Sequence, residues 1–437
     1  MISLRITRRL VTLAAVLAAA LPIGSMEGRA ATAALPNIVL VTLDTTRLDH
    51  LGCYGYFRET SPAIDRFAAE CVQFDGCLVP ISTTLPSHVS LFTATYPAEH
   101  GVRGNIAGQG MRFPWDRSRS FTRFLAEAGY RTAAFVSAAP LKRGTGIEEG
   151  FDAFDEPAEA ERPAGPTTDA ALAWLDTIAS GPYFLWVHYY DPHYPFQAPA
   201  PYAGTFVSDS ALDAYIRERL IPDRAPRLFV ARQDDSREAT NGYDAEVLYM
   251  DSEFGRLIDR VRARPDYEET YVLVVGDHGE GLGQHGEGGH GGIWDEQLRV
   301  PMLLRAPGEE PRRESRALSL VDALPTLLGR IGNETLSAFA VARSGRDALD
   351  PSFREEPVYG EETVVLAGGE PRRYTLTSRE WKYLRREGRG PKAGDQLFDL
   401  AADPFELLDV APAHADEVND LRARLRETIR IQRSRAA

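Results

Sequence analysis

The stretch from Asn37 to Asp44 reads Asn-Ile-Val-Leu-Val-Thr-Leu-Asp, a nearly continuous apolar run that ends in an acid. Such a run is typical of a central parallel strand that is covered on both faces. Two later segments repeat the pattern, since residues 183–190 lead to Asp191 and residues 271–276 lead to Asp277. In parallel sheets, ligands bind at the carboxyl ends of the strands. One acid in such a place is commonly a turn or cap residue, but three predict a binding site.

Helical patterns separate the predicted strands along the chain. They cover residues 62–70, 119–128, 168–179 and 244–262. Alternation of strands and helices predicts an α/β sandwich with a largely parallel central sheet. The polar, proline-containing residues 195–240 are expected to form an excursion with a short helix at 211–220.

The pattern changes after about residue 350. Short β-like segments at 356–360 and 373–386 precede Gln396–Leu400, and a charged helix is expected at about 413–432. These features predict a small antiparallel sheet with a helix packed on it. The chain is therefore expected to consist of a signal peptide at 1–33, a catalytic α/β domain at 36–345 and a C-terminal α+β subdomain at 346–437.

The N-terminal segment has the layout of a secretory signal peptide. Arg5, Arg8 and Arg9 precede an apolar run that ends near Leu21, and small residues follow. The run is short for a membrane span, although an uncleaved anchor is the alternative. The protein is thus expected to be exported, periplasmic or secreted, with no stable membrane insertion once the signal is removed.

The charge of the chain restricts its partners. The 437 residues carry a formal net charge of −14. An acidic surface argues against a nucleic-acid backbone or anionic lipid as the main partner. A small anionic substrate stays compatible, because metal ions and helix termini can dominate the field of a site. The three cysteines are too few for a disulfide framework, and whether Cys71 and Cys77 pair stays open.

The stretch Thr83-Thr84-Leu85-Pro86-Ser87-His88 predicts the start of a helix. Pro86 suits the first helical position, and Thr84 stands where a capping side chain would be. The amides of a first helical turn attract an anion. Thr84 is therefore either a helix cap or the nucleophile of an ester hydrolase.

The densest group of histidines lies between Gly276 and Gly291. Asp277 and His278 begin this segment, and its glycines allow the backbone to bend closely around an ion. Carboxylates together with imidazole are ligands for a divalent cation. The alternative is a polar loop with solvated histidines.

A set of ordered motifs connects these candidates. They are Asn37–Asp44, Leu51–Gly55, Ser61–Arg66, Pro86–Pro97 with His100 and Gly101, Asp191–Pro195, Asp277–Glu280, Arg299–Pro301, and Leu397–Leu400 with Asp403, Pro404 and Glu406. In this order the motifs resemble the sulfatase family, within the alkaline-phosphatase-like superfamily, over roughly residues 36–430. The resemblance implies the alkaline-phosphatase-like sandwich fold and a metal-dependent hydrolase of sulfate esters.

The resemblance also implies roles for single positions. Asp44, Asp277 and His278 fall where sulfatases place metal ligands, and Thr84 falls at the nucleophile position, where it would also contact the metal. His193 falls where a histidine contacts the sulfate and assists the leaving group. His290 stands where sulfatases usually have a lysine.

Three positions depart from the sulfatase pattern. Thr84 replaces the Cys or Ser that is oxidised to formylglycine, His88 replaces an arginine, and Thr45 replaces the second acid of an Asp-Asp pair. No formylglycine is expected, because the methyl group on Cβ of threonine prevents formation of the aldehyde. A threonine hydroxyl is a weak acid and needs a dication to act as a nucleophile. The expected catalytic residues are thus Thr84, His88, His193 and His290.

The identity of the ion and of the ester stays open. Ca²⁺ is the expected ion, with Zn²⁺ or Mn²⁺ as alternatives. A second, nitrogen-rich site is conceivable from His193, His285, His290 and Asp191, and Thr45 is a further candidate ligand. The expected substrate is a small anionic ester or a sulfated or phosphorylated glycan. Alternatives to a sulfatase are a phosphate mono- or diester hydrolase, an envelope phospho-group transferase, and a non-catalytic binding protein of the same fold.

Overall fold

A computed structural model describes residues 35–106, 113–219, 236–341, 343–364, 370–388 and 393–436. The predicted signal peptide at 1–33 lies outside the described residues. Residues from Leu35 onward form one compact unit.

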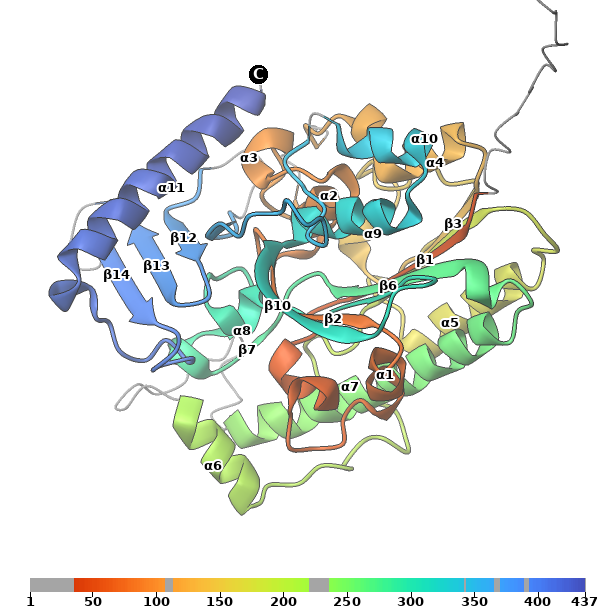
Figure 1. The fold of residues 1–437 in the computed structure, drawn as a ribbon. Helices are drawn as coiled ribbons and strands as arrows, with labels where there is room; N and C mark the ends of the chain where they lie inside the picture. The colour runs from red at the N-terminus through yellow and green to blue at the C-terminus, as the bar shows by residue number, and fades with distance from the viewer. Residues whose placement is uncertain are drawn as a thin grey trace, which may run out of the picture. The chain divides into compact units, whose positions relative to one another are not determined.

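A sheet of eight strands occupies the centre of this unit, in the order β10-β2-β9-β6-β1-β5-β3-β4 (Figure 1). β1 (Asn37–Leu43) lies between β5 (Tyr183–Tyr189) and β6 (Thr270–Gly276) and is parallel to both. β9 (Met302–Arg305) runs antiparallel to its neighbours, so the sheet is mixed but mostly parallel, as expected. The other strands are β2 (Val72–Leu78), β3 (Arg131–Phe135), β4 (Ala153–Asp155) and β10 (Arg312–Ser319).

Alternation along β1 sends its side chains to two separate cores. Val39, Val41 and Leu43 pack with residues of α1 (Pro62–Ala68), α5 (Ala164–Leu175) and α7 (Ser236–Arg262). Ile38 and Leu40 pack on the opposite face, which is covered by α2 (Thr84–Thr93), α4 (Phe121–Glu127) and α9 (Ala323–Ile331) (Figure 1). Because successive strand residues point to opposite faces, a strand buried on both sides must be apolar throughout.

The helix boundaries differ from expectation by several residues. α5 begins at Ala164 and ends at Leu175, four residues earlier than predicted. α7 begins at Ser236, eight residues before the predicted start, and Ala239 and Tyr243 in its first turns belong to the same core as Val39 and Leu43. The short helix of the predicted excursion is α6 (Ser210–Arg219). Smaller elements are α3 (Pro97–His100), α8 (Asp295–Leu298), α10 (Glu334–Ser337), β7 (Gly281–Leu282) and β8 (Gly288–Gly289).

A second sheet of four antiparallel strands follows, as the sequence predicted. Its strands, in order, are β11 (Val358–Glu361), β12 (Arg373–Thr377), β13 (Trp381–Arg386) and β14 (Gly394–Asp399). α11 (Ala415–Arg435) crosses this sheet and packs on it through Val418, Leu421 and Leu425 (Figure 1). Leu384 and Phe398 of the small sheet belong to the core of the large one, so the two sheets share apolar packing. The boundary at residue 345 stays a prediction.

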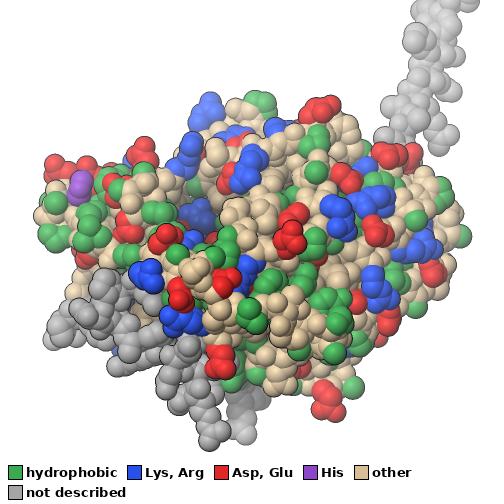
Figure 2. Space-filling model, turned by 90° about the horizontal axis from the view of Figure 1, so that it is seen from below, with side chains coloured by type: hydrophobic (Ala, Val, Ile, Leu, Met, Phe, Trp, Pro, Cys, Tyr) green, Lys and Arg blue, Asp and Glu red, His purple; other side chains and the backbone are tan. Residues whose placement is uncertain are grey.

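The surface of the protein carries charges of both signs, and two of its cysteines are buried. On the face drawn in Figure 2, acidic and basic side chains are interspersed. Among the described residues, no helix is both long and apolar enough to cross a membrane. Cys71 and Cys77 are buried free thiols, so the structure does not pair them.

Candidate active site

Two neighbouring strands deliver the central acids to one edge of the sheet. The register aligns Leu43 of β1 with Gly276 of β6, so that Asp44 and Asp277 follow side by side. The Nε2 atom of His278 lies 3.6 Å from Asp44 Oδ1 and 3.6 Å from Asp277 Oδ2. It also lies 3.4 Å from the hydroxyl of Thr84. The structure therefore brings these four predicted residues together, and all four are buried.

The carboxylates of this group suit a divalent cation. Both oxygens of Asp44 and Oδ2 of Asp277 are buried without a hydrogen-bond partner among the described residues. Burial raises the pKa of Asp44 to about 7, and burial together with the charge of Asp44 raises the pKa of Asp277. Unpaired buried carboxylates are costly unless a cation compensates them. One oxygen or nitrogen each from Asp44, Asp277 and His278 lies within 4.8 Å of the others, close enough to hold one ion.

The candidate nucleophile lies at the start of α2. Thr83, with extended backbone angles, is the N-cap, and Thr84 is the first helical residue. The prediction that Thr84 caps the helix is therefore wrong by one position, and Pro86 is the third helical residue and not the first. The amide of Leu85 donates to Asn105 Oδ1 at 2.9 Å. A side chain thus already satisfies one of the amides of the first turn.

His193 and His290 lie together beside His278. Their Nε2 atoms are 3.3 Å apart, and the rings of His278 and His290 are 4.4 Å apart. Nδ1 of His193 lies 2.6 Å from the carbonyl of Tyr194, and Nδ1 of His290 lies 3.1 Å from the carbonyl of Ser82. Because a carbonyl only accepts, Nδ1 of His290 carries a hydrogen. Nδ1 of His193 also lies 2.7 Å from the hydroxyl of Tyr190, which can donate or accept.

His88 lies on the α2 side of Asp277, with its Nδ1 3.6 Å from Asp277 Oδ2, and together with His188 it forms a second group at Asp277 that is close enough to hold an ion. Its ring is buried, with Nδ1 at 2.8 Å from the carbonyl of Thr84 and Nε2 at 3.0 Å from the hydroxyl of Thr42. Burial, followed by the neighbouring His188, lowers the pKa of His88 well below its usual value. Both ring nitrogens contact protein groups, and a catalytic role of His88 stays a prediction.

Two further candidate ligands make other contacts. The hydroxyl of Thr45 donates to the carbonyl of Pro192 at 2.7 Å. Asp191 accepts the amide of Ala164 at 2.8 Å and so satisfies the start of α5. Burial raises the pKa of Asp191 to about 7. Asp191 therefore lies at a helix terminus, whereas Thr45 contacts the group around His278 through its backbone amide, which donates to Asp277 Oδ1 at 3.3 Å.

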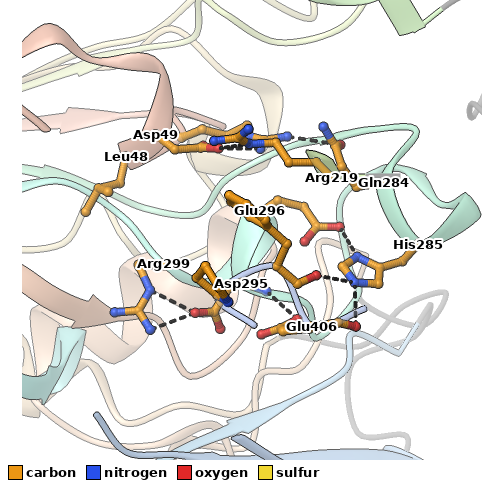
Figure 3. A pocket seen from close by; sticks show the side chains of 12 residues that line it. Leu48, Asp49, Arg219, Gln284, His285, Asp295, Glu296, Arg299 and Glu406 are labelled. Atoms are coloured by element: carbon orange, nitrogen blue, oxygen red, sulfur yellow. Dashed lines mark hydrogen bonds and ion pairs between the residues drawn. The ribbon is translucent and has the colours of Figure 1, made fainter. Parts of the chain in front are cut away.

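His285 lies in a separate cluster, drawn in Figure 3. Its Nδ1 is 2.9 Å from Glu296 Oε1, and its ring stacks on Trp294 with centroids 3.9 Å apart. Burial alone would lower the pKa of His285, but Glu296 outweighs it and raises that pKa to about 9. His285 lines a cavity of about 100 Å³ together with Arg47, Asp49, Arg219 and Glu406. The second ion site predicted from four residues is therefore not assembled, since only His193 and His290 meet.

Two buried residues near the acids, His188 and Glu280, were not predicted as site residues. Nε2 of His188 on β5 lies 3.4 Å from Asp44 Oδ2. Both carboxylate oxygens of buried Glu280 also lack a partner among the described residues. A histidine within an otherwise apolar strand was the available signal for His188. The register that aligns it with Thr42 could not be obtained from the sequence.

Comparison with known proteins supports the same architecture. The family model described as Sulfatase matches residues 36–333. An ulvan-active sulfatase of Formosa agariphila is 26% identical over 439 residues, which covers 90% of this chain and 81% of that protein. The solved structure of a sulfatase assigned as yidJ from Bacteroides fragilis superposes with a TM-score of 0.77 at 19% identity, covering 91% of this chain and 96% of that one. A phosphonate monoester hydrolase of Agrobacterium radiobacter gives a TM-score of 0.71 at 20% identity, with the same coverage.

Proposed function

Since this chain belongs to the sulfatase family of hydrolases, we propose that it hydrolyses sulfate esters at the site that contains Thr84. The observation that carries this proposal is the convergence of Asp44, Asp277 and His278 on the Thr84 hydroxyl. These four groups come from the ends of two central strands and the start of one helix. The proposal places Thr84 at the nucleophile position.

Asp44, Asp277 and His278 would hold the divalent cation, for which Ca²⁺ is the proposed ion. When bound, the cation would offset the two carboxylate charges and favour ionisation of a nearby hydroxyl. The Thr84 hydroxyl passes its proton to solvent water, its oxygen attacks the sulfur, and the bond from sulfur to the leaving oxygen breaks as that oxygen takes a proton from His193. Water then attacks the sulfur and the bond from sulfur to Thr84 breaks; one proton of this water goes to the Thr84 oxygen and the other to His193, and sulfate leaves.

His193 and His290 are proposed to contact the transferred group and to protonate the leaving oxygen. Both rings are held by backbone carbonyls at Nδ1, so their Nε2 atoms keep a fixed direction. Burial, together with the charge of His193, lowers the pKa of His290 to about 4. We assign the contact with the anion to the pair, and we propose that His193 protonates the leaving oxygen, which requires a hydrogen on its Nε2 as well as on Nδ1.

A phosphate mono- or diester hydrolase is the second candidate function. It is favoured by one observation, the threonine at position 84 in place of the formylglycine precursor. A phosphate ester is also an anion that the same cation and histidines would bind, so the site geometry suits both esters. The ester class is thus decided by assay.

The natural substrate is proposed to be a sulfated glycan, and the protein is proposed to be exported. The first proposal is supported by the relative described as an ulvan-active sulfatase. The second rests on the N-terminal sequence pattern. A protein of negative net charge can bind an anionic glycan when a cation and histidines make the potential at the site positive.

The test is an assay of the purified protein on aryl sulfate, aryl phosphate and bis-aryl phosphate, each with Ca²⁺, Mn²⁺ or Zn²⁺. We expect sulfate release that EDTA abolishes, and a loss of about 10³-fold or more in kcat for Thr84→Ala. Thr177→Ala, at an exposed threonine just beyond α5, is the matched control and should equal the parent. Unchanged activity of Thr84→Ala would exclude Thr84 as the nucleophile.

A further inference from the structure

The peptide group between Thr84 and Leu85 is held by side chains on both edges. Its carbonyl faces Nδ1 of His88 at 2.8 Å, and its N–H donates to Asn105 Oδ1 at 2.9 Å. His88 and Asn105 come from different segments, one within α2 and the other from the loop that follows α3. The plane of this peptide is therefore fixed independently of the helix's own hydrogen bonds.

The hydrogen on His88 has one consistent position. The indole of Trp186 donates to the hydroxyl of Thr42 at 2.9 Å, and this hydroxyl lies 3.0 Å from Nε2 of His88. An indole N–H only donates and a carbonyl only accepts, so the Thr42 hydroxyl donates to Nε2 and Nδ1–H donates to the Thr84 carbonyl. The hydrogen bonds run in one direction from Trp186 through Thr42 and His88 to Thr84.

This relay is closed to solvent. Trp186, Thr42 and His88 are all buried to 0% exposure. They belong to three elements, β5, β1 and α2, so the relay connects the sheet to the start of the helix. Losing one member would leave a buried polar group without a partner, which costs about 1–3 kcal/mol. Such a network is a means of holding one geometry and contacts no substrate.

Orientation of the peptide determines orientation of the hydroxyl. Threonine is β-branched, so few rotations about its Cα–Cβ bond are allowed once the backbone is set. The Thr84 hydroxyl lies 3.4 Å from Nε2 of His278, and a small rotation of the backbone would move it away. A nucleophile displaced by about 1 Å can lose about 10²-fold in rate.

We propose that His88 is a positioning residue, which holds the Thr84 carbonyl and thereby aims the Thr84 hydroxyl, and that Thr42 and Trp186 select the tautomer in which it can do so. This inference rests on the proposed function for the role of Thr84. It gives a specific task to the histidine that stands where sulfatases have an arginine.

Thr42 provides the sharpest test, because it touches neither the substrate nor Thr84. Thr42→Val keeps the shape and removes the hydroxyl, whereas Thr42→Ser keeps the hydroxyl. We expect Thr42→Val to lower kcat by about 10- to 100-fold with little change in KM, and Thr42→Ser to stay within about twofold of the parent. Calorimetry should give the same Ca²⁺ affinity for both, since the ligands are untouched. Equal kcat values for the two variants would overturn the proposal.

His88 itself can be replaced by asparagine or glutamine, whose side-chain amides differ in length. In His88→Asn the shorter side-chain amide can donate where Nδ1–H does, whereas the longer amide of His88→Gln reaches only the position of Nε2. We expect the His88→Asn variant to retain at least about tenfold more kcat than the His88→Gln variant, measured below both melting temperatures. The reverse order would contradict the role of Nδ1.

A spectroscopic measurement separates this inference from the proposed function. In protein labelled with ¹⁵N-histidine, His88 should show the Nδ1–H tautomer, and Thr42→Val should introduce the Nε2–H tautomer. This result needs no substrate. An Nε2–H tautomer in the parent would overturn the relay even if Thr84→Ala is inactive, whereas an active Thr84→Ala would overturn only the proposed nucleophile.

Discussion

At the scale of single residues, the site concentrates unsatisfied charge in one place. Asp44 and Asp277 are buried, and three of their four oxygens lack a hydrogen-bond partner among the described residues. The fourth, Asp277 Oδ1, accepts the amides of Thr45 and His278. The cost of these charges is a consequence of arranging ligands in advance for a cation. The charge of Asp44 should therefore lower the stability of the metal-free protein and increase its affinity for the cation.

Asp44→Asn tests this opposition. In EDTA we expect the variant to be more stable than the parent by about 1–3 kcal/mol and to melt at a higher temperature, because a buried charge is removed. In Ca²⁺ the parent should gain stability and the variant should not. Asp176→Asn, at an exposed acid that pairs with Arg260, is the matched control. A lower melting temperature for Asp44→Asn in EDTA would contradict the argument.

The difference in stability between the parent and Asp44→Asn in EDTA should depend on pH. Burial raises the pKa of Asp44 from 3.8 to about 7. Since the folded pKa exceeds the unfolded one, its contribution to stability is fully present below about pH 4 and is lost as the pH rises through 7. The advantage of Asp44→Asn in EDTA should thus be largest above pH 7 and vanish near pH 4. Melting curves of parent and variant across this range measure it.

At the scale of elements, an acid that follows a strand can accept a hydrogen bond from the start of a helix and does not have to bind an ion. Asp191 follows β5, as Asp44 follows β1, but its carboxylate accepts the first amide of α5. The N-cap of α5 is Pro163, whose side chain has no acceptor, so an acid from elsewhere takes that place. Only the position of α5 against β5 distinguishes the two acids.

Asp191→Ala and Asp191→Asn distinguish a cap from a ligand. The alanine variant should lose about 0.5–2 kcal/mol of stability, whereas the asparagine variant keeps the acceptor and should lose less. Neither should change Ca²⁺ affinity measured by calorimetry. A tenfold loss of affinity in both variants would return Asp191 to the metal site.

At the scale of the whole molecule, the small sheet is attached through buried charge as well as apolar packing. Nζ of Lys382 on β13 lies 2.7 Å from Asp295 Oδ1 and 2.6 Å from Glu406 Oε1. Lys382 is buried, and Asp295 begins α8, directly after the loop that carries His285 and His290. The same cluster contains the cavity of Figure 3. The active-site loop and the small sheet therefore depend on one ion network.

Lys382→Met should destabilise the protein by about 3–5 kcal/mol, because buried Glu406 loses its cation. Asp295 keeps its ion pair with Arg299. Arg424→Ala, at an exposed helical pair with Asp420, should change stability by less than about 0.5 kcal/mol. Urea unfolding of both variants measures the difference. Equal urea midpoints for the two variants would mean that the ion pairs of Lys382 do not help to hold the small sheet on the rest of the protein.

Most of the fold followed from local patterns. The three apolar runs were the central strands because a strand buried on both faces has no polar positions, and their carboxyl ends met as expected. Asp44, Asp277 and His278 were obtained in this way, and the ordered motifs added Thr84. His88 and Asp191 are polar residues near the same edge of the sheet, and their contacts could not be obtained from local patterns. Asp191 accepts the first amide of α5, and the ring of His88 contacts the Thr84 carbonyl and the Thr42 hydroxyl. Which groups such a side chain contacts depends on packing.

The sequence by itself determined the sheet, its apolar core and which strand ends carry acids, since these depend on periodicity and on hydrophobic burial along single segments. The tertiary structure alone decided which acids remain unpaired and which nitrogen of His88 meets the Thr84 carbonyl. It also separated His285 from His193 and His290. Hydrogen bonds and ion pairs act over a few ångströms between segments that are hundreds of residues apart. Their partners exist only once the register of the sheet and the placement of the helices are set.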